Sequence, residues 1–135
     1  MLGAFFDAVG NLLVSIRVWG SSQVPTGLRT PDTFVTIKAQ AITAGTPVTI
    51  WTPPAGKRFR LMGWSLTSSP ATTVIMEDAS GSANEFLRAG CAAAGTASIG
   101  PDLGNGYLSA AANNALCFDV TTSATINGFV YGVTE

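Results

Sequence analysis

The sequence predicts an all-β protein built as a sandwich or barrel, and three observations carry that prediction. Short segments that alternate apolar and polar residues recur at a spacing of roughly ten residues, as they do in such folds. No window longer than a turn or two shows the 3.6-residue period of a helix. Most of the 15 glycines and the 7 prolines fall between the segments, where they favour turns.

Residues 1–33 differ in character from the rest of the chain, and we expect them to form an extended N-terminal arm ahead of a sandwich domain over residues 34–135. A turn signal over residues 7–11 precedes one strand of about eight residues. Residues 20–32 are rich in glycine, proline and serine, which is typical of a linker. An ordinary first strand and a long loop remain the alternative. The two alternating faces of this strand are Leu12, Val14, Ile16 and Val18, and Leu13, Ser15, Arg17 and Trp19.

The next strands are separated by clear turn signals. The Pro53-Pro54 pair ends one of them, since proline donates no ladder hydrogen bond, and Gly56 favours the turn after it. Around Gly63 the apolar phase of the longest strand slips, so we expect a bulge there or burial of both faces. Helices are possible at 89–94 or 109–113, but flanking glycines and brevity favour loops. The predicted strands span residues 34–42, 48–52, 57–67, 73–77, 85–89, 97–99 and 106–110.

The end of the sequence has the pattern of a closing β-hairpin, with strands over residues 116–120 and 124–133 and a Thr/Ser turn between them. In the second strand Phe129 and Tyr131 lie on one face, while Ile126 and Val130 lie on the other. Neither face of this strand is therefore clearly polar and exposed to solvent. We expect it to be a central strand of the sandwich, or one that is buried between subunits.

The composition points toward an assembly subunit. Of the 135 residues only 11% are charged, the net charge is −1 and the mean hydropathy is +0.35. An isolated monomer with so few charges has little to keep it soluble, so we expect a homo-oligomer. The charge balance gives no attraction for nucleic acid. No stretch approaches the ~20 apolar residues of a membrane span, and no secretory signal is recognised.

Catalytic chemistry finds little support in the sequence. Histidine is absent, which excludes histidine-based triads and the commonest general base. Glu77 and Asp78 are adjacent, so on a strand they point to opposite faces, and we expect them at a solvated turn. The glycine-rich stretch 100–106 lacks the following lysine of a phosphate loop. Cys91 and Cys117 have no metal-site spacing and are expected as buried thiols, a single bridge being the alternative. We expect that the protein is not an enzyme and that it binds neither a cofactor nor a metal ion.

Several residues are candidates for contacts with partners. Lys57, Arg58, Phe59 and Arg60 form the one basic cluster, and ordinary solvated charge is the simpler interpretation. The three tryptophans, at 19, 51 and 64, suit core or interface positions better than a sugar-stacking platform. The candidate interface residues are Leu12, Val14, Ile16, Arg17, Trp19, Arg58, Arg60, Phe129 and Tyr131.

Three segments together resemble a known class of protein. They are DAVGNLLVSIR at 7–17, WTPPAGKRFRLMGW at 51–64 and ATINGFVYGV at 124–133. They resemble the small all-β virion proteins of tailed bacteriophages, above all those of the capsid decoration (cement) and head-fibre type. The resemblance implies a jelly-roll-like antiparallel β-sandwich, commonly a homotrimer, on the outside of a capsid.

In that picture the chain is a structural virion protein that binds the major capsid protein and stabilises the shell through many weak contacts. The N-terminal arm is then expected to add a strand to the sheet edge of a neighbour. The alternatives are a tail, baseplate or fibre-tip subunit that binds a host receptor or glycan, and a β-sandwich binding module of cellular origin.

Overall fold

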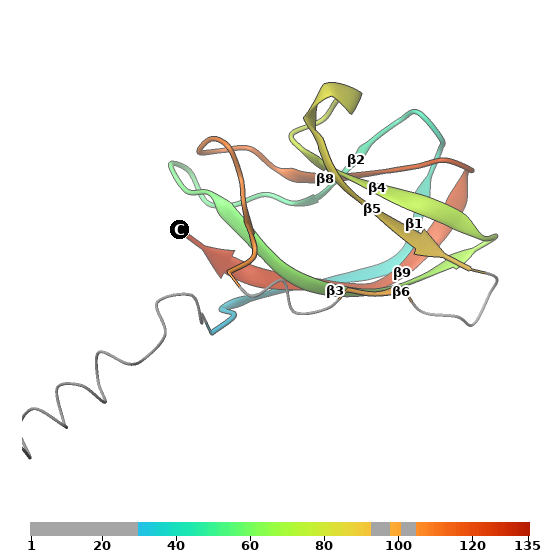
Figure 1. Cartoon of the computed structure of the whole chain (residues 1–135), viewed down its shortest axis with the longest axis horizontal. Coiled ribbons are helices and arrows are strands. Elements are labelled where there is room, and N and C mark those ends of the chain that lie inside the picture. Colours follow the sequence, from blue (N-terminus) through green and yellow to red (C-terminus); the bar gives the residue numbers. More distant parts are fainter. Residues whose placement is uncertain (1–29, 93–97, 101–104) are drawn as a thin grey trace, which may run out of the picture.

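The computed structural model of the chain describes residues 30–92, 98–100 and 105–135, which form two β-sheets packed face to face (Figure 1). The expected all-β sandwich is confirmed. The predicted arm strand over residues 12–19 lies outside the described residues. The described strands are β1 (Thr33–Ile42), β2 (Val48–Trp51), β3 (Phe59–Ser69), β4 (Thr72–Asp78), β5 (Glu85–Cys91), β6 (Ser98–Ile99), β7 (Tyr107–Leu108), β8 (Leu116–Val120) and β9 (Ala124–Thr134).

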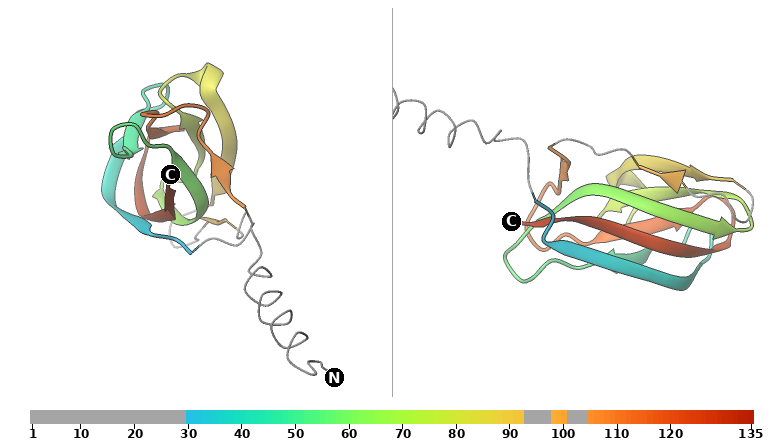
Figure 2. Two further views of the ribbon diagram at one scale, coloured as in Figure 1. Left: turned by 90° about the vertical axis from the view of Figure 1, so that its left-hand side faces the viewer. Right: turned by 90° about the horizontal axis from the view of Figure 1, so that it is seen from below.

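All of the strand pairs among the described residues are antiparallel. One sheet has the order β1-β9-β3-β6, with β7 pairing a different part of β3, and the other has the order β2-β8-β4-β5. Figure 2 shows β1, β9 and β3 side by side on one layer and the second sheet behind them. A 3-10 turn over Ser82–Asn84 joins β4 to β5, and residues 109–113 form a loop, as expected. None of the described residues forms a helix long and apolar enough to cross a membrane.

The prediction of a closing β-hairpin is wrong. Strands β8 and β9 are consecutive along the chain, yet β8 pairs with β2 and β4 while β9 pairs with β1 and β3. The turn between them carries the chain from one sheet to the other. The hydroxyl of Thr72 holds this turn, because it donates to the carbonyl oxygen of Thr122 at 2.9 Å and accepts from the Thr122 amide at 3.0 Å.

The expectation that β9 is a central strand is confirmed, since it pairs on both sides. Two glycines let β3 approach closely. A Cβ on Gly132 would lie 1.9 Å from the carbonyl oxygen of Arg60, and one on Gly128 would lie 1.9 Å from that of Ser65. Gly128 also has a φ of 135°, which other residues rarely adopt. A side chain at either position would push the two strands apart.

Strand β3 contains the predicted irregularity. Its pairing with β9 shifts register between Leu61 and Gly63, which is the mark of a bulge. The bulge moves Leu61 and Trp64 to the same side of the sheet, and both are buried in the core. The apolar phase slips in the sequence because the extra residue resets the alternation. Both faces of the strand are largely covered as well.

The core lies between the two sheets and includes two of the tryptophans. Trp51 and Trp64 are 5% and 6% exposed, which agrees with a core position and removes them as a sugar-stacking platform. Phe59 and Phe118 are completely buried in the same core. The core of buried apolar residues consists of Ile37, Ile42, Trp51, Phe59, Leu61, Trp64, Leu66, Val74, Met76, Ala89, Cys91, Leu116, Phe118, Val120, Ala124, Ile126 and Val130.

Candidate interaction surface

Three aromatic rings gather on the outer face of the sheet that contains β9. We call Phe34, Phe129 and Tyr131 the aromatic cluster. The rings of Phe34 and Tyr131 are stacked with centroids 5.6 Å apart, and each lies 6.2 Å from the ring of Phe129. These are distances at which aromatic rings attract one another. Phe34 is 67% exposed and Phe129 is 37% exposed, the two large apolar side chains that stand open to solvent among the described residues.

The strand register explains how these rings meet. Phe34 on β1 lies opposite Tyr131 on β9, and Tyr131 in turn lies opposite Gly63 on β3. Residues directly opposite one another in antiparallel strands project to the same face. The ring of Tyr131 lies across Gly63, where a Cβ would come within 2.4 Å of the phenolic oxygen. Because glycine has no side chain, position 63 leaves the space that the ring of Tyr131 occupies.

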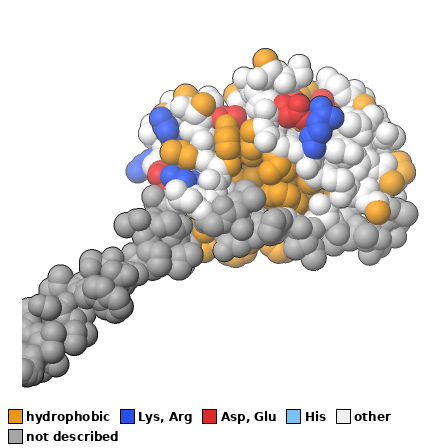
Figure 3. All heavy atoms as spheres, viewed as in Figure 1, with side chains coloured by type: hydrophobic (Ala, Val, Ile, Leu, Met, Phe, Trp, Pro, Cys, Tyr) orange, Lys and Arg blue, Asp and Glu red, His pale blue; other side chains and the backbone are white. Residues whose placement is uncertain are grey.

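The residues directly opposite Phe129 are uncharged. Phe129 lies opposite Thr36 on β1 and Ser65 on β3, and neither carries a charge. Figure 3 shows another face of the molecule, where charged side chains are few and grouped and apolar side chains gather between them. Elsewhere in the fold, Phe86 and Tyr107 are partly buried and stack with centroids 3.8 Å apart. The exposed apolar rings of the aromatic cluster suit contact with another protein.

The structure places the predicted interface residues in different environments. Phe129 and Tyr131 are brought together, as part of the aromatic cluster. Arg60 is not available, because it is buried at 7% exposure, pairs with the carboxylate of Glu135 and donates to the carbonyl oxygen of Asn105 at 2.7 Å. The expectation of solvated charge at Arg60 is therefore wrong. Arg58 is half-buried just before β3, where its backbone pairs with that of Glu135.

The remaining candidates, Leu12, Val14, Ile16, Arg17 and Trp19, lie outside the described residues. Sequence reasoning missed Phe34, which the structure places at the most exposed position of the aromatic cluster. The signal was present, since Phe34 shares its alternation phase with Thr36 and Lys38 rather than with Val35 and Ile37. An aromatic residue on the polar phase of a strand indicates an exposed ring.

A groove opens on the side of the sandwich between β1 and β2, which are the edge strands of the two sheets. We call it the lateral groove. It has a volume of about 340 Å³ and is lined along β1 by Val35, Ile37 and Lys38 and along β2 by Thr49 and Ile50. Val35 and Ile50 are half-buried and pack against the core from this side. The partly buried apolar side chains beside the core are thus accessible laterally, between two edge strands.

Glu77 and Asp78 are buried rather than solvated, with 1% and 5% exposure, so the expectation of a solvated turn is wrong. Asp78 accepts hydrogen bonds from the hydroxyl of Tyr107 at 2.9 Å, the side chain of Asn114 at 3.0 Å and the backbone amide of Ala110. Burial, and then the neighbouring Asp78, raise the pKa of Tyr107 to about 12.

Glu77 does not share the hydrogen-bond donors of Asp78; its carboxylate accepts a hydrogen bond from the backbone amide of Gly81 at 2.7 Å. The two carboxylates therefore serve separate loops and do not converge on one point, as the strand geometry predicts. The carboxylate of Asp78 in particular holds the segment after β7 against the end of β4. This arrangement stabilises the loop, because the Asp78 carboxylate is occupied by three donors, from Tyr107, Ala110 and Asn114, at the side of a hollow of about 260 Å³.

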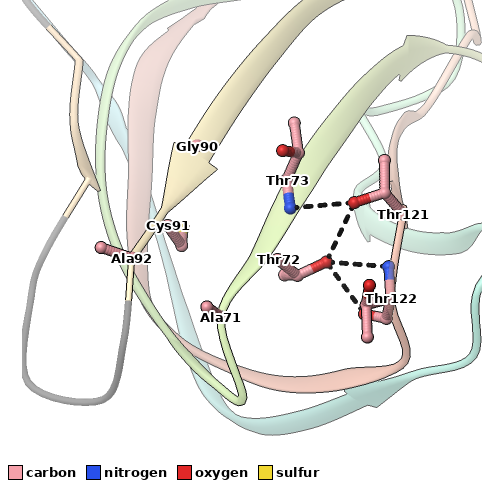
Figure 4. A pocket seen from close by; sticks show the side chains of 8 residues that line it. All are labelled: Ala71, Thr72, Thr73, Gly90, Cys91, Ala92, Thr121 and Thr122. Atoms are coloured by element: carbon pink, nitrogen blue, oxygen red, sulfur yellow. Dashed lines mark hydrogen bonds between the residues drawn. The ribbon is translucent and has the colours of Figure 1, made fainter.

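A hollow of about 540 Å³ at the opposite end of the sandwich is lined by small residues (Figure 4). The hydroxyls of two of its four threonines, Thr72 and Thr121, are engaged in hydrogen bonds. The Thr72 hydroxyl bonds the backbone of Thr122, and the hydroxyl of Thr121 accepts from the Thr73 amide at 3.2 Å. Figure 4 shows these groups pointing toward one another across the hollow. The residues that line the hollow carry no charge.

Cys91 and Cys117 are both free and buried, as the sequence predicts. Cys91 belongs to the core, while Cys117 lies beside the hydroxyl of Thr49 at 3.8 Å. Burial raises the pKa of both thiols, which keeps them in the unreactive thiol form. No group of three or more metal-ligating side chains occurs within the described part of the chain.

Comparisons with protein-family models, with curated proteins and with solved structures find no match to this chain.

Proposed function

We propose that the chain is a structural virion protein of a tailed bacteriophage, a capsid decoration protein that binds the outer capsid surface and stabilises the shell. The aromatic cluster is the observation that carries this proposal. It places exposed rings beside the uncharged Thr36 and Ser65 on a sheet face, in a chain of which 11% is charged. Burying such a face against another protein is favourable at roughly 25 cal/mol per Å² of apolar area. The sheet face is suited to packing rather than to chemistry.

We further infer that the sandwich is a jelly roll. When β7 is set aside, the first strand pairs with the last (β1 with β9) and the second pairs with the next to last (β2 with β8). The same nesting continues inward with β3 and β6, and then with the adjacent strands β4 and β5. A chain that pairs in this nested order is a folded antiparallel ribbon, which is how a jelly roll wraps its two sheets. Jelly rolls are common in viral shells.

Stabilisation of a shell results from mass action. A protein that binds the assembled shell and not its free subunits lowers the free energy of the assembled state with every copy bound. If the chain is a homotrimer, as we propose, each trimer presents three aromatic clusters at once. Simultaneous contacts raise the overall affinity by about 10²–10⁴ over a single contact, provided that the geometry lets them engage together. Weak individual contacts then suffice.

Electron cryo-microscopy of the particle that carries this chain tests the proposal. We expect density for the sandwich on the outside of the head, with the aromatic cluster against the major capsid protein. Particles with Phe34→Ser should carry fewer copies and lose their shells at a lower temperature. Arg88→Ala, an exposed change on the other sheet, is the matched control and should leave occupancy unchanged. Absence of the chain from the head would contradict the proposal.

The same cluster also favours a second candidate, a tail, baseplate or fibre-tip subunit that binds a host glycan. Exposed rings beside hydroxyl and amide groups suit the apolar and polar faces of a sugar. Phe129 lies opposite Thr36 and two residues along β9 from Asn127, and both of these side chains are exposed. Binding to a glycan array that is lost in Phe34→Ser, together with density at the tail tip, would favour this role over decoration.

A further inference from the structure

The backbone edge of β1 beside the lateral groove is unpaired over a longer stretch than the edge of β2 on the facing sheet. β1 pairs with β9 on one side, and no described strand pairs with its other side. An unpaired edge strand presents a row of free backbone donors and acceptors to any suitable segment. On the facing sheet, β2 is only four residues long and lies between Pro47 and Pro53, which shield it. β1 contains no proline.

The open edge is regular along its first half only. Pairing between β1 and β9 is continuous from Thr33 to Ile37 and then shifts register. Beyond the shift Ala39 has a φ of 47°, and its amide is taken by the side-chain oxygen of Asn127 at 2.7 Å. Lys38 stands exposed at the same point. A bulge and a lysine are features that end strand addition, so an added strand is limited to the stretch before Lys38.

We propose that residues 12–19 of a second copy of this chain add to β1 as an edge strand and cover the lateral groove. The inward side chains of β1 here, Val35 and Ile37, are apolar, and Ile50 faces them from β2. An added strand must therefore present apolar residues to the groove at every second position. One face of the segment meets that requirement without exception: Leu12, Val14, Ile16 and Val18.

The other face of the segment has a mixed composition. Ser15 and Arg17 would point to solvent, while Leu13 and Trp19 on the same phase would extend the apolar surface of the outer face beside Phe34, which is 67% exposed. A slip of one residue would turn Arg17 toward the groove and the apolar face outward. Burying an unpaired charge is costly, so the pattern specifies one face of the strand unambiguously.

The length of the connection favours a second copy over the chain's own β1. Residues 20–32 separate the segment from β1, and the chain enters β1 where the Asp32 amide donates to the carbonyl oxygen of Gly132 at 2.9 Å. Hairpins onto an adjacent strand commonly have loops of about two to five residues, much shorter than this connection. Thirteen residues extend to about 43 Å at ~3.3 Å each, which is enough to reach a neighbouring molecule.

The proposal is tested with full-length chains in a complementation experiment. A donor-deficient variant carries Val14→Asp and Ile16→Asp, while its β1 edge is unchanged. An acceptor-deficient variant carries Val35→Lys, which places a charge in the groove, while its own segment is unchanged. Sedimentation velocity measures the mass of each alone and of the two mixed. Ser15→Asp, on the outward face of the same segment, is the matched control.

We expect the wild-type chain and Ser15→Asp to sediment as oligomers, each deficient variant alone to sediment as a monomer, and the mixture to recover a two-chain species. A monomeric wild-type chain at tens of micromolar overturns the proposal. So does failure of the mixture to associate while both variants retain the wild-type circular dichroism. If Val35→Lys does not fold, Ile50→Lys replaces it on the β2 side of the same groove.

The experiment uses no virion component. Its failure would leave the proposed position on a capsid open to its own test, and a chain found elsewhere than on a capsid would leave strand exchange between copies intact.

Discussion

Gly63 and Tyr131 should be strongly coupled in stability, because the ring of one occupies the space that a side chain on the other would need. A Cβ at position 63 would lie 2.4 Å, 2.5 Å and 2.7 Å from the Oη, Cζ and Cε1 atoms of Tyr131. Favourable contacts between such atoms lie at about 3.5–4.0 Å, so Gly63→Ala must displace the ring by about 1 Å.

The displacement sets the expected magnitudes. Moving the ring gives up the stacking of Tyr131 on Phe34, which is worth about 0.5–1.5 kcal/mol, and adds packing strain. We expect Gly63→Ala to lower the free energy of unfolding by about 1–2 kcal/mol. In a Tyr131→Ala background the obstruction is gone, and alanine is favoured over glycine in a strand by roughly 0.5–1 kcal/mol. The coupling energy should therefore be about 2 kcal/mol.

Urea denaturation of the four chains of this cycle measures the coupling, with the fluorescence of the buried Trp51 and Trp64 as the signal. Gly90→Ala is the matched control, since a Cβ there meets nothing within 4 Å. If the effects of Gly63→Ala and Tyr131→Ala add within about 0.5 kcal/mol, the ring does not occupy the space over Gly63 and the reasoning fails.

Three further expectations concern buried groups. Gly132→Ala should unfold the chain or cost more than Gly63→Ala in the same urea titration, because the obstructing atom, the carbonyl oxygen of Arg60, belongs to the backbone and lies 1.9 Å away. Because the pKa of Tyr107 is raised from 10.0 to about 12, the unfolded chain loses this proton first, so stability falls between those pH values; unfolding titrations against pH should show a smaller fall in Tyr107→Phe. Cys91 and Cys117 should react with a thiol reagent only after unfolding, and rapid labelling of the native chain would contradict their burial.

The positions of the strands could be predicted from the sequence because the signals are local. Alternation and turn residues placed all nine described strands within two residues of their ends. β7 is the weakest match, since Ser109 and Ala110 leave the expected strand to bond with Ala111 and Asp78. Even the bulge in β3 was visible as a slip of phase at Gly63.

Pairing could not be predicted in the same way, because it depends on segments far apart in the chain. β8 and β9 look like a hairpin locally, and only the presence of β2 and β4 on one side and β1 and β3 on the other separates them. The burial of Glu77 and Asp78 has the same cause. The hydrogen-bond donors to Asp78 include Tyr107 and Asn114, about thirty residues away, which no local pattern connects to it.

Two of the three residues of the aromatic cluster were predictable. Phe129 and Tyr131 stood out because their strand has no wet side, whereas Arg60 was misplaced because its partner, Glu135, lies on a distant segment.

The central position of β9 also constrains how the chain reaches its fold. β1 and β3 are synthesised first, yet neither pairs with the other, and the strand that joins them comes last. The amide of Thr134 donates to the carboxylate of Asp32, 102 residues earlier. Contacts of such long sequence separation slow folding. Until β9 is made, two strands of this sheet expose apolar surface and free edges, so the chain depends on late closure and is vulnerable to aggregation during synthesis.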